Sequence, residues 1–179
     1  MSPRGRVLKG HLPLQLSRVL PPIPNLGAVL LLPRAQLQRD VLQLLREARA
    51  LGVAGDVEFR VSIANDEKRA LLEACTCVLY TPANEHFGIV PLEAMAAGKP
   101  VVACDSGGPK ESVAHGVTGF LCAPESAAFA AAMARVAGGR EGQAAARRMG
   151  VLARQRVEWK FSRKAFGDRM LGLMPGLIA

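Results

Sequence analysis

The chain has 179 residues, of which 50% are apolar and 21% are charged, and its formal net charge is +8 at pH 7. This composition excludes a disordered or fibrous protein and leaves room for one domain with a hydrophobic core. Aromatic residues make up only 4%, so few rings can stack on bases and we expect no nucleic-acid partner. The four cysteines form no C-x2-C pair, which predicts reduced, buried thiols.

The first 27 residues are rich in Leu, Pro and Arg and show no dependable periodicity. We expect residues 1–27 to be irregular or disordered. The most apolar stretch, residues 12–33, is interrupted by Arg18 and five prolines, so it does not read as a membrane span. Positive charge gathers after Arg135. Both a surface for anionic lipid headgroups and an ordinary solvated helix face fit that pattern.

From residue 28 onward, short apolar runs alternate with amphipathic stretches. Strands are expected at 28–32, 57–61, 77–81, 100–104 and within 117–122. Helices are expected at 37–51, at 66–74 with Asn65 or Ser62 as cap, from Pro91 to Gly98, from Pro109 to Gly116, at 126–137, at 141–154, and from the Ser162 cap to Met174. This alternation predicts an α/β domain in which a Rossmann-like parallel sheet carries helices on both faces.

The stretch from Asn84 to Ala94 joins a predicted strand to a predicted helix. Glu85 lies in the loop after the strand, and Glu93 is expected in the first turn of a helix that Pro91 opens. Free N–H groups at the start of that helix would bind an anion, and ligands of open α/β sheets bind at the carboxyl ends of strands. Two carboxylates would repel a phosphate there, so we expect them to accept hydrogen bonds from sugar or ribose hydroxyls.

Three sequence blocks carry a resemblance to a known family. Glu85 and Glu93 enclose His-Phe-Gly-Ile-Val-Pro-Leu, and residues 105–111 (Asp-Ser-Gly-Gly-Pro-Lys-Glu) and 116–121 (Gly-Val-Thr-Gly-Phe-Leu) follow. In this order and spacing they resemble the donor-binding half of retaining GT-B glycosyltransferases of the GT4 type. Residues 76–95 are similar in particular to the eukaryotic mannosyltransferases that build dolichol-linked oligosaccharide for asparagine-linked glycosylation.

The similarity runs from about Val57 to about Phe166. It implies that residues 28–158 are the nucleotide-sugar donor-binding domain, the C-terminal half of a GT-B fold, and that residues 159–179 form a crossover helix toward the first domain. Such enzymes bind the donor diphosphate with an Arg and a Lys near the start of this half, and no matching segment precedes residue 28. We therefore expect a truncated chain that is inactive alone. The alternative is a non-catalytic module that keeps the fold and binds ligands or partners weakly.

The resemblance also implies residue roles. Glu85 would act as the catalytic residue by binding hydroxyls of the transferred hexose, and Glu93 would bind the ribose hydroxyls. An ordinary loop acid and an ordinary acid near the helix dipole are the alternatives. Tight-turn sterics would also explain the glycines after residue 106. The further donor-binding residues would be His86, Phe87, Gly88, Ile89, Val90, Ser106, Gly107 and Gly108.

The implied reaction is transfer of mannose, with retention, from GDP-mannose to a dolichol-diphosphate oligosaccharide at the cytosolic face of the endoplasmic reticulum membrane. The basic C-terminal region would touch that membrane. We expect no cofactor and no metal, because helix N-termini and basic residues can hold a leaving diphosphate. The sequence contains no Asp-x-Asp motif.

Overall fold

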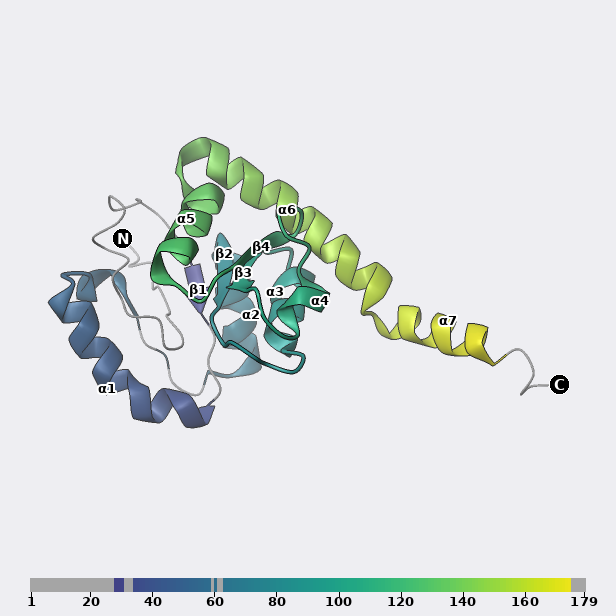
Figure 1. Ribbon diagram of the computed structural model, residues 1–179, viewed down its shortest axis with the longest axis horizontal. Coiled ribbons are helices and arrows are strands. Elements are labelled where there is room, and N and C mark those ends of the chain that lie inside the picture. Colours follow the sequence, from purple (N-terminus) through teal and green to yellow (C-terminus); the bar gives the residue numbers. More distant parts are fainter. Residues whose placement is uncertain (1–27, 31–33, 59, 61–62, 175–179) are drawn as a thin grey trace.

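The computed structural model describes residues 28–30, 34–58, 60 and 63–174, so the predicted irregular segment 1–27 lies outside the described residues. Within them the chain forms a four-stranded sheet in the order β1-β2-β3-β4, and every neighbouring pair is parallel (Figure 1). The predicted parallel α/β fold is confirmed. The strands are β1 (Ala28–Leu30), β2 (Cys77–Tyr80), β3 (Val101–Cys104) and β4 (Gly119–Cys122).

Helices surround this sheet on both faces, as predicted. Right-handed crossovers between successive parallel strands place the helices between them on one face of a sheet, and here α2 and α3 pack on one face. The helix after the last strand then returns over the other face. The elements are α1 (Arg34–Ala50), the 3₁₀ turn η2 (Ala54–Asp56), α2 (Asn65–Ala74), α3 (Ile89–Ala96), α4 (Pro109–Ser112), α5 (Ser126–Ala137), α6 (Gly139–Lys160) and α7 (Arg163–Leu173).

The core shows this arrangement in its side chains. Successive residues of β2 and β3 point alternately into two hydrophobic clusters, one on each face of the sheet. Helix α5 closes the first cluster, and helices α2 and α3 close the second. Helix α6 contributes Ala146 to the first cluster and Ala153 to the second. It therefore packs against both layers.

Helix α3 begins earlier than the sequence predicts. Its N-cap is Gly88 and its first residue is Ile89, so Pro91 is the third residue and Glu93 the fifth. Proline is tolerated there because the N–H groups of the first turn have no partner within the helix. The first turn contains no acidic residue. The alternative role of Glu93 as a first-turn acid is thereby weakened, since the helix dipole acts mainly within that turn.

Two further predictions differ from the structure around residues 57–65. Asn65 is the first residue of α2 rather than its cap, and the N-cap Ala64 has no side chain to make a capping bond. Among residues 57–61, the described ones are not in a strand. One of them, Arg60, pairs with Glu58 at 2.5 Å and with Glu67 of α2 at 2.6 Å. The rest of that predicted strand, and Ser62, lie outside the described residues.

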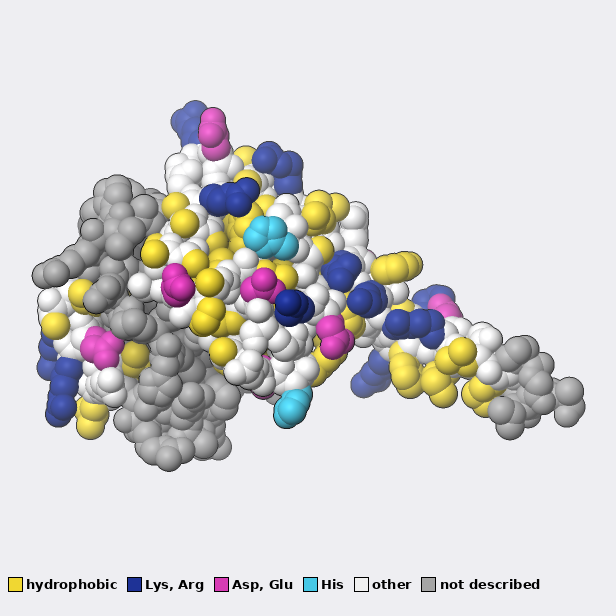
Figure 2. Space-filling view, in the orientation of Figure 1, with side chains coloured by type: hydrophobic (Ala, Val, Ile, Leu, Met, Phe, Trp, Pro, Cys, Tyr) yellow, Lys and Arg dark blue, Asp and Glu magenta, His cyan; other side chains and the backbone are white. Residues whose placement is uncertain are grey.

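The C-terminal end of α6 and helix α7 extend away from the sheet (Figure 1). Helix α6 runs to Lys160, so the boundary expected at Trp159 falls inside it. Ser162 caps α7 as predicted, since its hydroxyl accepts a hydrogen bond from the N–H of Ala165 at 3.1 Å. On the face shown in Figure 2, apolar side chains gather along the lower side of α7, and basic side chains lie above and beside them. In the part of the chain that the structure describes, no helix is long and apolar enough to cross a membrane.

The cysteines are buried and free, as predicted. Burial raises the pKa of Cys75 to about 11, of Cys77 to about 12 and of Cys122 to about 11, from 9.0.

Above the ordinary thiol pKa of 9.0, the unfolded chain releases protons that the folded chain keeps. We therefore expect the free energy of unfolding to fall above about pH 9, by up to about 1.4 kcal/mol per pH unit for each thiol. Urea denaturation at about pH 8 and about pH 10.5 measures the slope, and Cys77→Ala should reduce it; an unchanged slope in that variant contradicts the assignment.

Candidate active site

Two loops lie side by side at the carboxyl edge of the sheet. We call them the Glu85 loop (residues 81–88, after β2) and the Ser106 loop (residues 105–108, after β3). The Ser106 hydroxyl accepts a hydrogen bond from the N–H of Asn84 at 2.9 Å and donates one to Oδ1 of Asn84 at 2.9 Å. The N–H of Gly108 donates to the carbonyl of Glu85 at 2.8 Å. The structure thus brings the predicted residues of both loops together.

The glycines of the Ser106 loop permit this close approach. A Cβ atom on Gly107 would lie 2.1 Å from the Glu85 carbonyl oxygen, and one on Gly108 would lie 2.0 Å from the Phe87 carbonyl oxygen. Gly107 also has φ +57°, which disfavours other residues. Sterics therefore account for both glycines. Their contact with a donor stays a prediction.

Tyr80 is a site residue that the sequence did not reveal. It ends β2, is only 3% exposed, and its hydroxyl interacts with the Glu85 carboxylate. Burial and then this interaction raise the pKa of Tyr80 above its usual value, so the hydroxyl stays protonated and can donate to the carboxylate. A Cβ atom on Gly88 would lie 2.8 Å from that hydroxyl. The available signal was a tyrosine in an otherwise apolar buried strand, since a buried phenol needs a polar partner.

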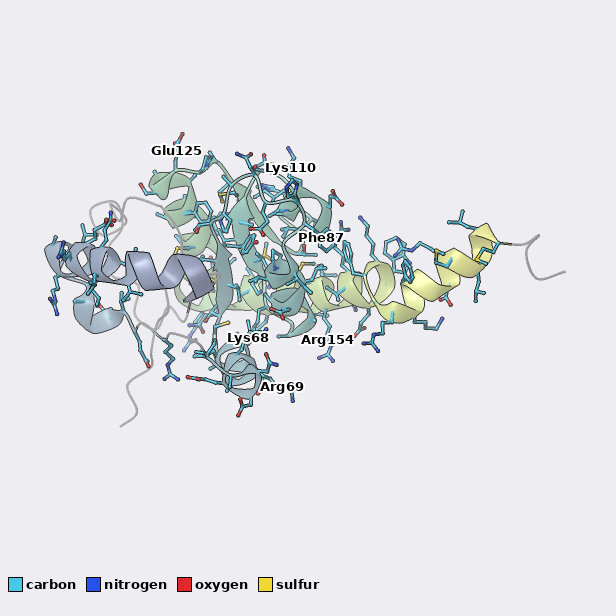
Figure 3. The ribbon with its side chains drawn as sticks, turned by 90° about the horizontal axis from the view of Figure 1, so that it is seen from below. Lys68, Arg69, Phe87, Lys110, Glu125 and Arg154 are labelled. Carbon is cyan, nitrogen blue, oxygen red and sulfur yellow. The ribbon has the colours of Figure 1, made fainter. Side chains whose placement is uncertain are left out.

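Glu93 is also held by a residue that we did not assign from the sequence. Nζ of Lys68, on α2, lies 2.7 Å from Oε1 of Glu93, on α3. The two side chains are 28% and 31% exposed, respectively. Figure 3 shows Lys68 on the side of α2 nearest the body of the domain. Glu93 is thus paired with a lysine across two helices and is not a free surface acid.

The segment from His86 to Val90 runs from the Glu85 loop directly into α3. No side chain caps the start of this helix. Its first N–H groups are therefore not engaged by a capping side chain, which is the condition for the predicted anion site. Phe87 is exposed beside it, and its ring contacts the ring of Phe161 edge to face, with centroids 6.4 Å apart.

Several cations of the basic C-terminal region have structural roles. Arg156 donates to the carbonyls of Ser112 at 2.7 Å and Glu111 at 3.0 Å, at the end of α4. Lys160 donates to the same Glu111 carbonyl at 3.4 Å. These bonds satisfy carbonyls at a helix end and hold α4 against α6. Part of the charge after residue 135 is therefore explained by helix packing.

Comparison with known proteins identifies the family. Residues 38–156 match the family described as "Glycosyl transferases group 1". The human Alpha-1,3/1,6-mannosyltransferase ALG2 is 51% identical over 122 residues, which are 68% of this chain and 29% of that protein. The ALG2 of Dictyostelium discoideum is 41% identical over 128 residues, 72% of this chain and 30% of that protein.

A solved structure supports the same assignment. Anabaena Alr3699/HepE, in a crystal structure with UDP and glucose, matches with TM-score 0.65 and 26% identity over 94% of this chain and 48% of that chain. The chain belongs to the group 1 glycosyltransferase family, and the predicted half of a GT-B fold is confirmed. The match begins at residue 38, earlier than the resemblance seen from Val57 onward. Its matched segment spans less than a third of the length of these curated relatives.

Proposed function

We propose that this domain binds the sugar-nucleotide donor for mannosyl transfer in the synthesis of dolichol-linked oligosaccharide. The observation that carries the proposal is the pair of hydrogen-bonded loops that bring Glu85 to the carboxyl edge of the sheet, just before the uncapped start of α3. The identity to mannosyltransferases supports mannose as the sugar. The relatives extend far beyond the matched segment, so the activity of a whole enzyme is part of the proposal.

GDP-mannose is the proposed donor. Glu93 accepts hydrogen bonds from the ribose hydroxyls, and Glu85 accepts them from hydroxyls of the mannose. The start of α3 and the backbone of residues 86–90 face the diphosphate. As the acceptor oxygen bonds to the anomeric carbon, the bond from that carbon to the GDP oxygen breaks, and the hydroxyl proton passes to the leaving diphosphate. The helix start stabilises the charge that develops on the leaving GDP, so the proposal needs neither a cofactor nor a metal.

The acceptor and location come from the similarity of residues 76–95. They are a dolichol-diphosphate oligosaccharide and the cytosolic face of the endoplasmic reticulum membrane. Helix α7 supports contact with such a surface, since Phe166, Met170 and Leu173 are exposed at helical spacing and arginines lie on the same helix. Apolar side chains enter the headgroup region of a bilayer while basic ones bind anionic lipids.

Donor binding tests the proposal directly. We expect the purified chain to bind GDP-mannose more tightly than UDP-glucose in a calorimetric titration. Glu93→Gln should weaken GDP-mannose binding by about 1–3 kcal/mol, because the ribose hydroxyls lose the charged carboxylate that accepts their hydrogen bonds. Glu73→Gln, the same change at an exposed position on α2, should have little effect. A folded chain that binds neither nucleotide contradicts the donor-site proposal.

Assays of mannosyl transfer distinguish an enzyme domain from a non-catalytic module. Residues 1–179 alone should not transfer mannose, because holding the acceptor in place contributes up to about 7–11 kcal/mol to such reactions. A chimera in which this domain replaces the matching segment of human ALG2 should transfer mannose to a dolichol-linked acceptor. Donor binding together with an inactive chimera would favour the non-catalytic module.

Tyr80→Phe should lower turnover of that chimera by about tenfold, because the substitution keeps the ring and removes the hydroxyl that interacts with the Glu85 carboxylate. The Michaelis constant for GDP-mannose should change less than kcat. Steady-state kinetics at saturating acceptor measure both constants. The control is Phe120→Leu, a change in a buried ring of β4 on the opposite face of the sheet from Tyr80, which should affect stability more than kcat. Equal kcat for Tyr80→Phe and the parent chimera would show that the hydrogen bond does not serve turnover.

A further inference from the structure

We infer that Lys68 is a positioning residue for the donor site: it orients the Glu93 carboxylate toward the ribose of the nucleotide. This inference rests on the proposed function, and it assigns a role to a residue outside the three sequence blocks. Lys68 lies on α2, 25 positions before Glu93, and the two meet only because α2 and α3 pack on the same face of the sheet.

The geometry gives Glu93 a defined orientation. Lys68 Nζ contacts Oε1 at 2.7 Å, so Oε2 is the oxygen through which a ribose diol would be bound. Because Glu93 lies beyond the first turn of α3, the helix dipole does not fix its side chain. A charge-assisted hydrogen bond from a lysine does.

The charge of Lys68 also reduces the repulsion between the Glu93 carboxylate and a diphosphate. An unpaired carboxylate close to a diphosphate would repel it, and opposite charge at 2.7 Å offsets that repulsion. Lys68 thus lets an acidic residue bind hydroxyls next to an anionic ligand. The ribose hydroxyls then have a hydrogen-bond acceptor in Glu93. The Lys68–Glu93 pair as a whole adds no net negative charge beside the phosphates.

A purely structural role explains the pair poorly. Both side chains are about a third exposed, and ion pairs with that much exposure contribute little to folding stability. Helix α2 is also held independently, because Lys99 Nζ donates to the carbonyls of Glu73 at 2.8 Å and Cys75 at 2.9 Å at its C-terminal end. Removing Lys68 should therefore leave α2 in place.

The test compares two probes, GDP and 2′,3′-dideoxy-GDP, which differ only in the ribose hydroxyls. Affinities of the full chain for both are measured by titration, and thermal unfolding is recorded for each variant. We expect the parent to prefer GDP by about tenfold. Lys68→Met should remove most of that preference, and Lys68→Arg should retain most of it. Arg69→Met is the control, because it removes an exposed positive charge from the adjacent position on α2 and should keep the preference (Figure 3).

The outcomes separate this inference from the proposed function. If Lys68→Met still prefers GDP over 2′,3′-dideoxy-GDP, the positioning role is overturned. If that variant keeps the preference but loses affinity equally for both probes, Lys68 acts on the diphosphate instead. In either case the donor site stands. A parent chain that binds both probes equally refutes the ribose contact of Glu93, and one that binds neither refutes the donor site itself. Each of these last results also overturns the role of Lys68.

Discussion

Glu85→Ala is expected to reduce mannosyl transfer by the ALG2 chimera about 100-fold, with a much smaller effect on GDP-mannose affinity. The reason is positional: Glu85 would hold the reacting sugar, and loss of alignment at the reacting carbon lowers the rate far more than it lowers binding of the whole nucleotide. Single-turnover rates at saturating donor, together with donor titrations, measure the two effects separately.

Two substitutions at this position separate charge from packing. In Glu85→Ala the buried Tyr80 hydroxyl loses its acceptor, so part of any effect comes from an unsatisfied polar group. Glu85→Gln keeps an oxygen that can accept from Tyr80 and removes only the negative charge. If both variants lose turnover, the carboxylate itself binds the sugar. If Glu85→Gln has the turnover of the parent, Glu85 acts through its position in the loop and the catalytic assignment is wrong.

Gly108→Ala is expected to disrupt the site by steric conflict alone. Gly108 has φ −56° and ψ −35°, which any residue adopts easily. The added methyl group, however, would lie 2.0 Å from the carbonyl oxygen of Phe87. The two loops must separate to accommodate it. We expect a loss of about 1–3 kcal/mol in the free energy of unfolding, and donor affinity should fall by about tenfold or more because the Glu85 loop moves.

Gly167→Ala is the matched control for this prediction. Gly167 lies inside α7, and a Cβ atom there would meet nothing within 4 Å. Alanine should therefore stabilise the helix by about 0.5–1 kcal/mol. Chemical denaturation and donor titration of both variants provide the comparison. A Gly108→Ala protein with parental stability and donor affinity would mean that the loops approach less closely than described.

The sequence predicted the parts of the site that depend on local pattern. The Glu85 loop follows a buried apolar strand and the Ser106 loop follows the next one, so their meeting at one sheet edge could be foreseen. The start of α3 was misplaced because Pro91 is favoured as a first residue but is also tolerated at the third. Local rules leave that choice open.

The residues that support the two glutamates could not be predicted in the same way. Lys68 meets Glu93 across 25 positions, and this contact depends on how α2 and α3 pack together. Tyr80 stands out in its strand as a phenol that needs a polar partner, but the strand pattern does not say that this partner is Glu85. The alternation at residues 57–61 does not give a strand at the described positions, because alternation alone does not supply a neighbouring strand to pair with. Pairing between distant elements, rather than propensity, decided each case.

The hydrogen bonds between the Glu85 and Ser106 loops affect how a ligand would bind and how the loops could vary. Because hydrogen bonds within the protein fix both loops against each other, a donor arriving there would not have to order them, and it would lose little of its binding free energy to chain entropy. The same hydrogen bonds make the position of each loop depend on the other. An insertion in one loop would separate it from the other, so we expect a change in the length of either loop alone to disturb the site.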